Sequence, residues 1–260
     1  MTAEPLAALL RHDRAVLLGG LAAVSGAAWV YLLLGAGVPM DMMDMGGGRM
    51  MAMLPEWSVG YAAIIFVMWA VMMVAMMLPS AAPVILLAAA LDRQRGAADA
   101  RRRSAFFAAG YLLVWFGFSL TATALQWGLD GAGLLSETMA TGNRVLAGGV
   151  LVLAGIYQWT PLKNACLAHC RSPVGFLMQH WRPDAAGAVA MGLRHGLFCL
   201  GCCWMLMALL FVGGLMNLLW VAAITLLVLV EKVAPWGGRM SRITGAVLAL
   251  WGAGALAALV

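Results

Sequence analysis

Charged residues are scarce in this sequence. Only 10% of its 260 residues are Asp, Glu, Lys or Arg, whereas 64% are hydrophobic. A soluble domain carries about 25% charged and about 45–50% apolar residues, so this composition excludes an ordinary soluble protein. The sequence also lacks a P-loop, a G-x-S-x-G motif and an H-E-x-x-H motif. It therefore shows no machinery for ATP-driven transport or classical hydrolysis.

Long apolar stretches make up most of the chain. A helix needs about 20 apolar residues to cross a membrane, and the stretches near this length are 15–38, 57–80, 105–127, 143–160, 186–212, 215–231 and 243–260. They predict an all-α fold, a polytopic transmembrane helix bundle of about seven spans. The whole chain, 1–260, forms a single integral membrane domain on this prediction. Pro79 and Pro83 can kink the second span, which otherwise continues to about Leu91.

Basic residues are distributed unevenly between the predicted loops. The net charge is +5, and arginines concentrate in the connector 92–104, whereas segment 39–56 holds Arg49 alone. Because positively charged loops stay in the cytoplasm, the N-terminus is predicted inside and the C-terminus outside. This orientation makes 92–104 a solvated cytoplasmic loop and 39–56 an extracytoplasmic loop. It also accounts for the positive charge, so we expect membrane lipid and no nucleic acid as a partner.

All five cysteines lie between positions 166 and 203. Cys166, His169 and Cys170 follow the fourth span, in a segment 161–185 that we predict to be cytoplasmic or to re-enter the membrane. Cys166 and Cys170 share one face if the segment is helical. The group is either a set of metal ligands or a set of small buried thiols. An odd number of cysteines excludes complete disulfide pairing within one chain.

The fifth span carries the second group, His195, Cys199, Cys202 and Cys203. At 100° per residue Cys199 and Cys202 lie on either side of His195, and Cys203 lies farthest round the helix. Two thiolates about one turn apart can hold one soft ion. A histidine inside a membrane span usually faces the bundle interior or a cavity. The alternative is that the cysteines replace Ala or Ser where helices cross closely beside glycines.

Methionines are unusually frequent, with 20 in the chain. Thioethers select copper(I), although methionine is also a flexible core filler. A methionine-rich loop outside the membrane could capture the ion, or it could instead dip into the bilayer. The predicted thioether ligands are Met68, Met72 and Met76 on one face of the second span and Met40, Met42, Met43 and Met45 in the 39–56 loop.

Glu231 and Lys232 are unusual polar residues at the end of the sixth span. They can cap and anchor that span at the membrane surface. Alternatively, they can pair with Arg194 or His195 of the fifth span.

Five stretches of the chain together resemble a bacterial family of predicted metal-binding integral membrane proteins, a family classed as a domain of unknown function. They are "MWAVMMVAMMLPSAAP" (68–83), "YQWTPLKNACLAHCRSP" (157–173), "GLFCLGCCWMLM" (196–207), "GGLMNLLW" (213–220) and "EK" (231–232). The resemblance implies a multi-helix bundle in the bacterial inner (cytoplasmic) membrane, with copper or another soft ion as cargo. It also implies a small separately encoded partner protein, and as ligands Cys166, Cys170, Cys199, Cys202 and Cys203.

Residues and resemblance together predict a copper(I)-handling membrane protein rather than an enzyme. The 39–56 loop captures the ion, the methionines of the second span pass it inward, and a thiolate site holds it. Zinc is an alternative cargo, because the two cysteine groups together could supply its four ligands. Two other classes stay open: a membrane thiol-disulfide oxidoreductase that uses Cys199 and Cys202, and a structural subunit of a membrane complex. The predicted thiolate site consists of Cys199, Cys202 or Cys203, completed by His195 or by Cys166 and Cys170.

Overall fold

A computed structural model describes residues 3–38, 41–44, 50–53, 55–95, 99–136 and 139–258 of the chain. Helices make up most of these residues, as the apolar composition requires, because a helix satisfies its own backbone hydrogen bonds. The helices are α1 (Ala3–Leu33), α2 (Val59–Gln94), α3 (Ala100–Gly131), α4 (Arg144–Tyr157), α5 (Pro161–Arg171), α6 (Pro173–His180), α7 (Ala185–Ala208), α8 (Leu210–Gly213), α9 (Leu218–Val233) and α10 (Gly237–Ala257).

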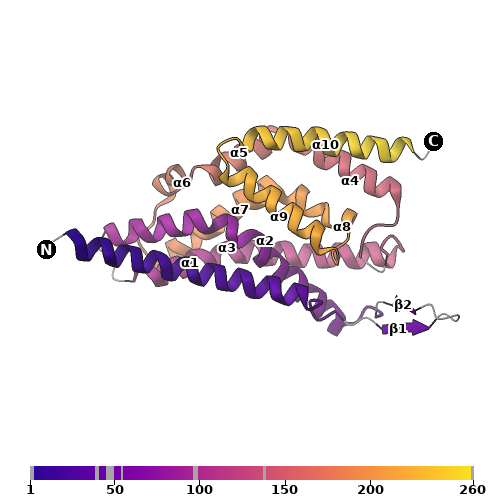
Figure 1. Ribbon diagram of the computed structural model, residues 1–260, viewed down its shortest axis with the longest axis horizontal. Coiled ribbons are helices and arrows are strands. Elements are labelled where there is room, and N and C mark those ends of the chain that lie inside the picture. The colour runs from indigo at the N-terminus through magenta and orange to yellow at the C-terminus, as the bar shows by residue number, and fades with distance from the viewer. Residues whose placement is uncertain are drawn as a thin grey trace.

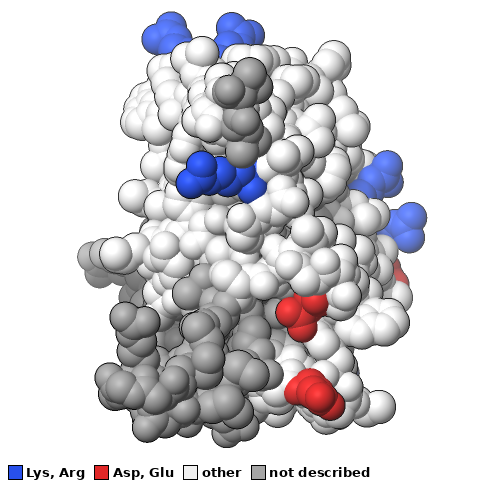
Figure 2. Space-filling model, turned by 90° about the vertical axis from the view of Figure 1, so that its right-hand side faces the viewer, with Lys and Arg blue, Asp and Glu red and all other residues white. Residues whose placement is uncertain are grey.

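Five helical segments are long and apolar enough to cross a membrane: Arg14–Leu33, Val59–Gln94, Ala100–Gly131, Ala185–Gly213 and Gly237–Ala257. A sixth arises if α4 and α5, which meet at an angle of 64°, count as one broken span. Helix α9 has only 16 residues. The predicted helical bundle is thus confirmed, while the count of seven spans stays a prediction. Wide areas of uncharged side chains separate a few charged ones on the face shown in Figure 2.

The two chain ends lie at opposite ends of the long axis of the molecule (Figure 1). Helix α2 continues through Pro79 and Pro83 as predicted and ends at Gln94. It lies between α1 and α3, α3 packs along α7, and α10 packs along α4. Which end faces the cytoplasm stays a prediction.

The predicted 39–56 loop contains a short β-hairpin at one end of the bundle (Figure 1). Strands β1 (Asp41–Asp44) and β2 (Met50–Met53) pair antiparallel, with Asp41 opposite Met53. The strand pairing satisfies backbone groups that an irregular loop would leave to water. Of the predicted ligands, Met42 and Met43 belong to β1, and Met40 and Met45 lie outside the described residues.

The basic connector 92–104 is shorter than predicted. Helix α2 ends only at Gln94 and α3 already begins at Ala100. Arg103 is buried rather than solvated, because Asp92 lies 2.7 Å from its Nε and supplies the countercharge. Its guanidinium also donates to the carbonyl oxygens of Arg182 and Pro183. Arg103 therefore ties the start of α7 to the α2–α3 corner.

Glycines allow α3 and α7 to approach backbone to backbone. A Cβ atom at Gly192 would overlap the Phe107 carbonyl, and one at Gly110 would overlap the Val189 carbonyl. Small residues at such crossings permit close helix packing within a membrane. This contact fixes the rotation of α7, and with it the direction of its cysteine stripe.

Candidate metal centre

A sharp bend between α4 and α5 brings the first cysteine group to the second. Helix α4 ends at Tyr157, and Thr160 caps the next helix by accepting a hydrogen bond from the Lys163 amide at 3.3 Å. Pro161 occupies the first turn of α5, where its missing N–H costs nothing. The 64° angle between the helices turns α5 back against α7. The segment thus folds back against α7, and its re-entry into the membrane stays a prediction.

Cysteine sulfurs face one another across the contact between α5 and α7. The sulfurs of Cys170 and Cys202 lie 4.0 Å apart. Cys166 lies beside Gly201, where an added Cβ would be only 2.7 Å from its sulfur. The glycine at 201 therefore lets the thiol-bearing face of α5 approach α7. The two cysteine groups, whose combination in one site the sequence left open, are neighbours in the described part of the chain.

Cys199 lies at the meeting point of four helices. Its sulfur accepts a hydrogen bond from the Lys232 ammonium of α9 at 2.8 Å and lies 2.9 Å from the Tyr111 hydroxyl of α3. Lys232 also donates to Ser80 on α2 at 3.1 Å. Tyr111 donates to the Met77 carbonyl at 3.0 Å. Cys199 thus contacts a buried positive charge, which stabilises a thiol in its anionic form.

The remaining thiols of α7 turn toward their own backbone. Cys202 and Cys203 both donate to the Cys199 carbonyl, at 3.1 and 2.9 Å. All three are 1% exposed. In the described residues, no three His, Cys, Asp or Glu side chains are placed so as to hold one ion together. The thiols are neighbours, and an ion would need them to rotate away from that carbonyl.

Both predicted histidines contact aromatic rings. His195 is 3% exposed, and its ring centroid lies 5.0 Å from that of Phe176 and 5.8 Å from that of Tyr111. Its Nδ1 atom is buried with no hydrogen-bond partner in the described part of the chain. His169 stacks on Phe198 at 4.1 Å between ring centroids. His195 therefore remains one turn from Cys199, with a nitrogen that is free to bind.

The methionines of α2 that the sequence predicts as ligands are buried. Met68, Met72 and Met76 are at most 2% exposed. Met68 and Met72 also line a cavity of about 200 Å³ together with Met216, which the sequence analysis did not single out. At 1.5 Å per residue, Met68 and Met77 are about 13 Å apart along the helix axis. Met72 and Met76 lie between these two positions along α2, and the Met77 backbone carbonyl is connected to Cys199 through the Tyr111 hydroxyl.

A family model described as copper chaperone, PpoB2, matches residues 66–255. The chain belongs to this copper chaperone family. The match includes the methionine face of α2 and all five cysteines, and it begins after the methionine-rich hairpin. No curated protein and no solved structure matches the chain. The family resemblance predicted from the sequence is confirmed, and with it copper handling in general.

The protein also holds a buried ion pair next to its cysteines. Lys163 of α5 lies 2.7 Å from Glu231 of α9, and their side chains are 0% and 2% exposed. Gln158 approaches the other Glu231 oxygen at 3.4 Å. Glu231 and Lys232 thus have partners other than Arg194 or His195, the pairing that the sequence offered as one alternative. The sequence signal for this buried pair is the presence of charged residues in an apolar helix, since such residues usually mark a functional site.

Proposed function

We propose that this copper chaperone is an integral membrane protein that binds copper(I) between α5 and α7. The contact of Cys170 and Cys202 carries this proposal. Two sulfurs bound to one ion at about 2.3 Å each are at most about 4.6 Å apart, and about 3.8 Å apart in a tetrahedral site. The observed separation of 4.0 Å lies within this range. Cys199 is the natural third ligand, because it shares the buried face of α7.

The donor set favours copper(I) over zinc. Thiolate and thioether sulfur are soft ligands that select copper(I), whereas zinc takes four ligands from cysteine, histidine and carboxylate. The site has thiols from α5 and α7, and α2 contributes buried thioethers to the same hydrophobic core. Two or three thiolates around one monovalent cation leave a net negative charge. The Lys232 ammonium, 2.8 Å from Cys199, supplies a positive charge against it.

We infer a route for the ion that is compatible with this geometry. Copper(I) enters from the hairpin end, outside the bacterial inner membrane, into the cavity lined by Met68, Met72 and Met216. The methionines of α2 pass it to the thiols. Because the site lies between a re-entrant helix and a membrane span, rotation of α5 can present the ion to a small partner protein. Met40, Met42, Met43 and Met45, the ligands predicted in segment 39–56, would gather copper before entry.

A matched set of variants tests the site. Cys202→Ser combined with Cys170→Ser removes both facing sulfurs, and the serine hydroxyl at 202 can still donate to the Cys199 carbonyl. Met205→Leu removes another buried sulfur of α7 at similar volume, outside the cysteine stripe. In competition with bicinchoninate under reducing conditions, the double variant should lose at least about tenfold in copper(I) affinity. Met205→Leu should bind as the unchanged protein does. Equal affinity in all three proteins would refute the site.

The same sulfur pair supports a second candidate, a membrane thiol-disulfide oxidoreductase. Cys170 and Cys202 would be the exchanging pair, rather than Cys199 and Cys202, because their sulfurs face each other across two helices. Exchange would transfer two electrons to a partner disulfide and join the two sulfurs. Thiol trapping in cells separates the candidates: an oxidoreductase shows a Cys170–Cys202 disulfide that cycles, and a copper chaperone keeps both thiols reduced.

A further inference from the structure

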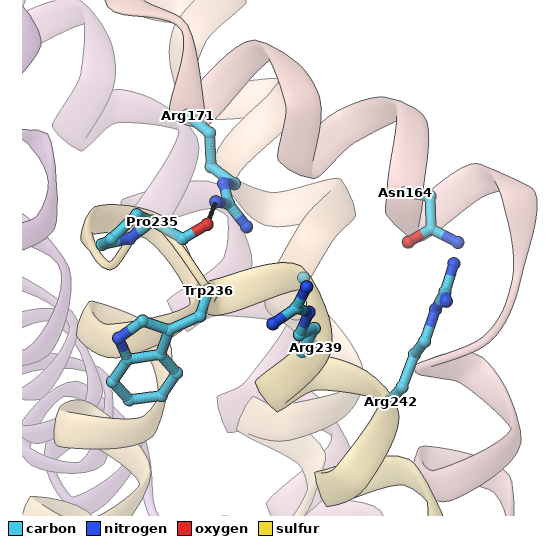
Figure 3. A pocket seen from close by; sticks show the side chains of 7 residues that line it. Asn164, Arg171, Pro235, Trp236, Arg239 and Arg242 are labelled. Atoms are coloured by element: carbon cyan, nitrogen blue, oxygen red, sulfur yellow. Dashed lines mark hydrogen bonds between the residues drawn. The ribbon is translucent and has the colours of Figure 1, made fainter.

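A cavity of about 520 Å³ lies between α5 and the first turns of α10 (Figure 3). Its lining carries three guanidinium groups and no carboxylate. In the close-up, the side chains of Asn164 and Arg242 point toward each other, and Arg239 lies between Trp236 and Arg242. The lining residues are Asn164, Arg171, Pro235, Trp236, Gly238, Arg239 and Arg242.

The basic side chains are positioned by the fold. Arg171 donates to the carbonyl oxygens of Ala234 and Pro235, at 3.0 and 2.7 Å. An added Cβ at Gly238 would lie 3.4 Å from its guanidinium, so glycine leaves room for the arginine at the start of α10. Arg239 and Arg242 are three residues apart and therefore neighbours on one helix face. Three positive charges thus converge on one cavity without acidic neighbours in its lining.

We propose that this cavity binds the phosphate group of an anionic phospholipid. Arginine pairs with phosphate through two parallel hydrogen bonds. Basic pockets at the ends of membrane helices are typical sites for anionic headgroups. Among the described residues the guanidinium groups of Arg239 and Arg242 have no hydrogen-bond or ion-pair partner, while Arg171 anchors the rim.

The surroundings of the cavity favour a lipid over a free phosphate. Trp236 at the rim is 51% exposed, and tryptophan is enriched where membrane meets water. Farther along α10, Ile243 and Val247 are 59% and 56% exposed. These apolar side chains continue from the arginines in the direction that acyl chains would take. A free phosphate would use the arginines alone.

A bound headgroup would also support the copper site. Arg171 directly follows Cys170, and Ala234 and Pro235 follow Lys232 by two and three residues. A phosphate held between α5 and α10 would therefore fix the re-entrant helix against α9. This inference rests on the membrane location proposed above.

The test uses the full chain in detergent, with native mass spectrometry after addition of phosphatidylglycerol, phosphatidylcholine or inorganic phosphate. Arg239→Gln with Arg242→Gln removes two phosphate donors and keeps the backbone contacts of Arg171. Arg14→Gln with Arg144→Gln removes the same charge at exposed sites elsewhere. We expect phosphatidylglycerol to be retained by the unchanged protein and the control. The pocket variant should retain at least about tenfold less.

Three results would overturn the proposal. One is equal retention of phosphatidylglycerol and phosphatidylcholine. A second is equal loss in the control variant. The third is competition by inorganic phosphate at the concentration of the lipid, which would make the cavity a site for free phosphate. Copper(I) binding is measured on the same samples. If the unchanged protein binds the lipid but does not bind copper(I), the proposed function alone is refuted.

Discussion

Replacing Glu231 by glutamine removes one charge from the buried pair that joins α5 to α9. At 2.7 Å and an effective dielectric constant of about 20, two unit charges attract each other by about 6 kcal/mol. Desolvation offsets much of this attraction. Removing one partner nevertheless leaves Lys163 charged and buried, which costs about 3–5 kcal/mol. Because about 1 kcal/mol corresponds to about 2–4 °C for a chain of this size, Tm should fall by about 6–20 °C.

The assay is thermal unfolding of the purified protein in one detergent, with copper(I) affinity measured in parallel. Glu231→Gln should lower both the Tm and the copper(I) affinity, since the Lys163–Glu231 pair positions α5 and with it Cys170. Glu231→Gln combined with Lys163→Met removes both charges. The free energy of unfolding of this double variant should lie within about 2 kcal/mol of that of the unchanged protein. The reasoning fails if the single variant keeps its Tm. It also fails if the double variant is as unstable as the single one.

Two more substitutions test the neighbouring contacts. Lys232→Met should lower copper(I) affinity by at least about tenfold, because it removes the positive charge 2.8 Å from Cys199; a chelator titration that shows unchanged or higher affinity would contradict this role. Gly192→Ala should destabilise the protein by about 1–3 kcal/mol, because its Cβ would overlap the Phe107 carbonyl. Gly117→Ala on α3, with open space around it, should unfold at or above the temperature of the unchanged protein, and a similar loss in both alanine variants would contradict the close packing.

Apolar length predicted the main helices well. The spans expected at 57–80, 105–127 and 186–212 correspond to α2, α3 and α7, since each must bury its backbone over the same distance. The span expected at 143–160 ends in a bend. Thr160 and Pro161 were the local signal, as a capping residue followed by proline marks a helix start. The direction of the new helix depends on packing with α7, which spacing does not determine.

In the candidate site, too, the sequence predicts which residues share a helix face, whereas packing determines which residues lie opposite them. The helical repeat placed Cys199 and Cys202 on one face, and this face is buried. The register that sets Cys170 opposite Cys202 depends on the α4–α5 bend and on Gly201. The contact of Lys232 with Cys199 crosses 33 residues of sequence. The charge pattern indicated that Lys232 needed a partner, but only the packing of α9 against α7 determines which one.

X-ray absorption at the copper edge tests the central claim most directly. The purified protein is loaded with one equivalent of copper(I), and the same is done for Cys202→Ser. We predict a first shell of sulfur alone in the unchanged protein, and one sulfur fewer in the variant. A shell of nitrogen and oxygen in the unchanged protein, or an identical sulfur shell in the variant, would contradict a copper(I) site between α5 and α7.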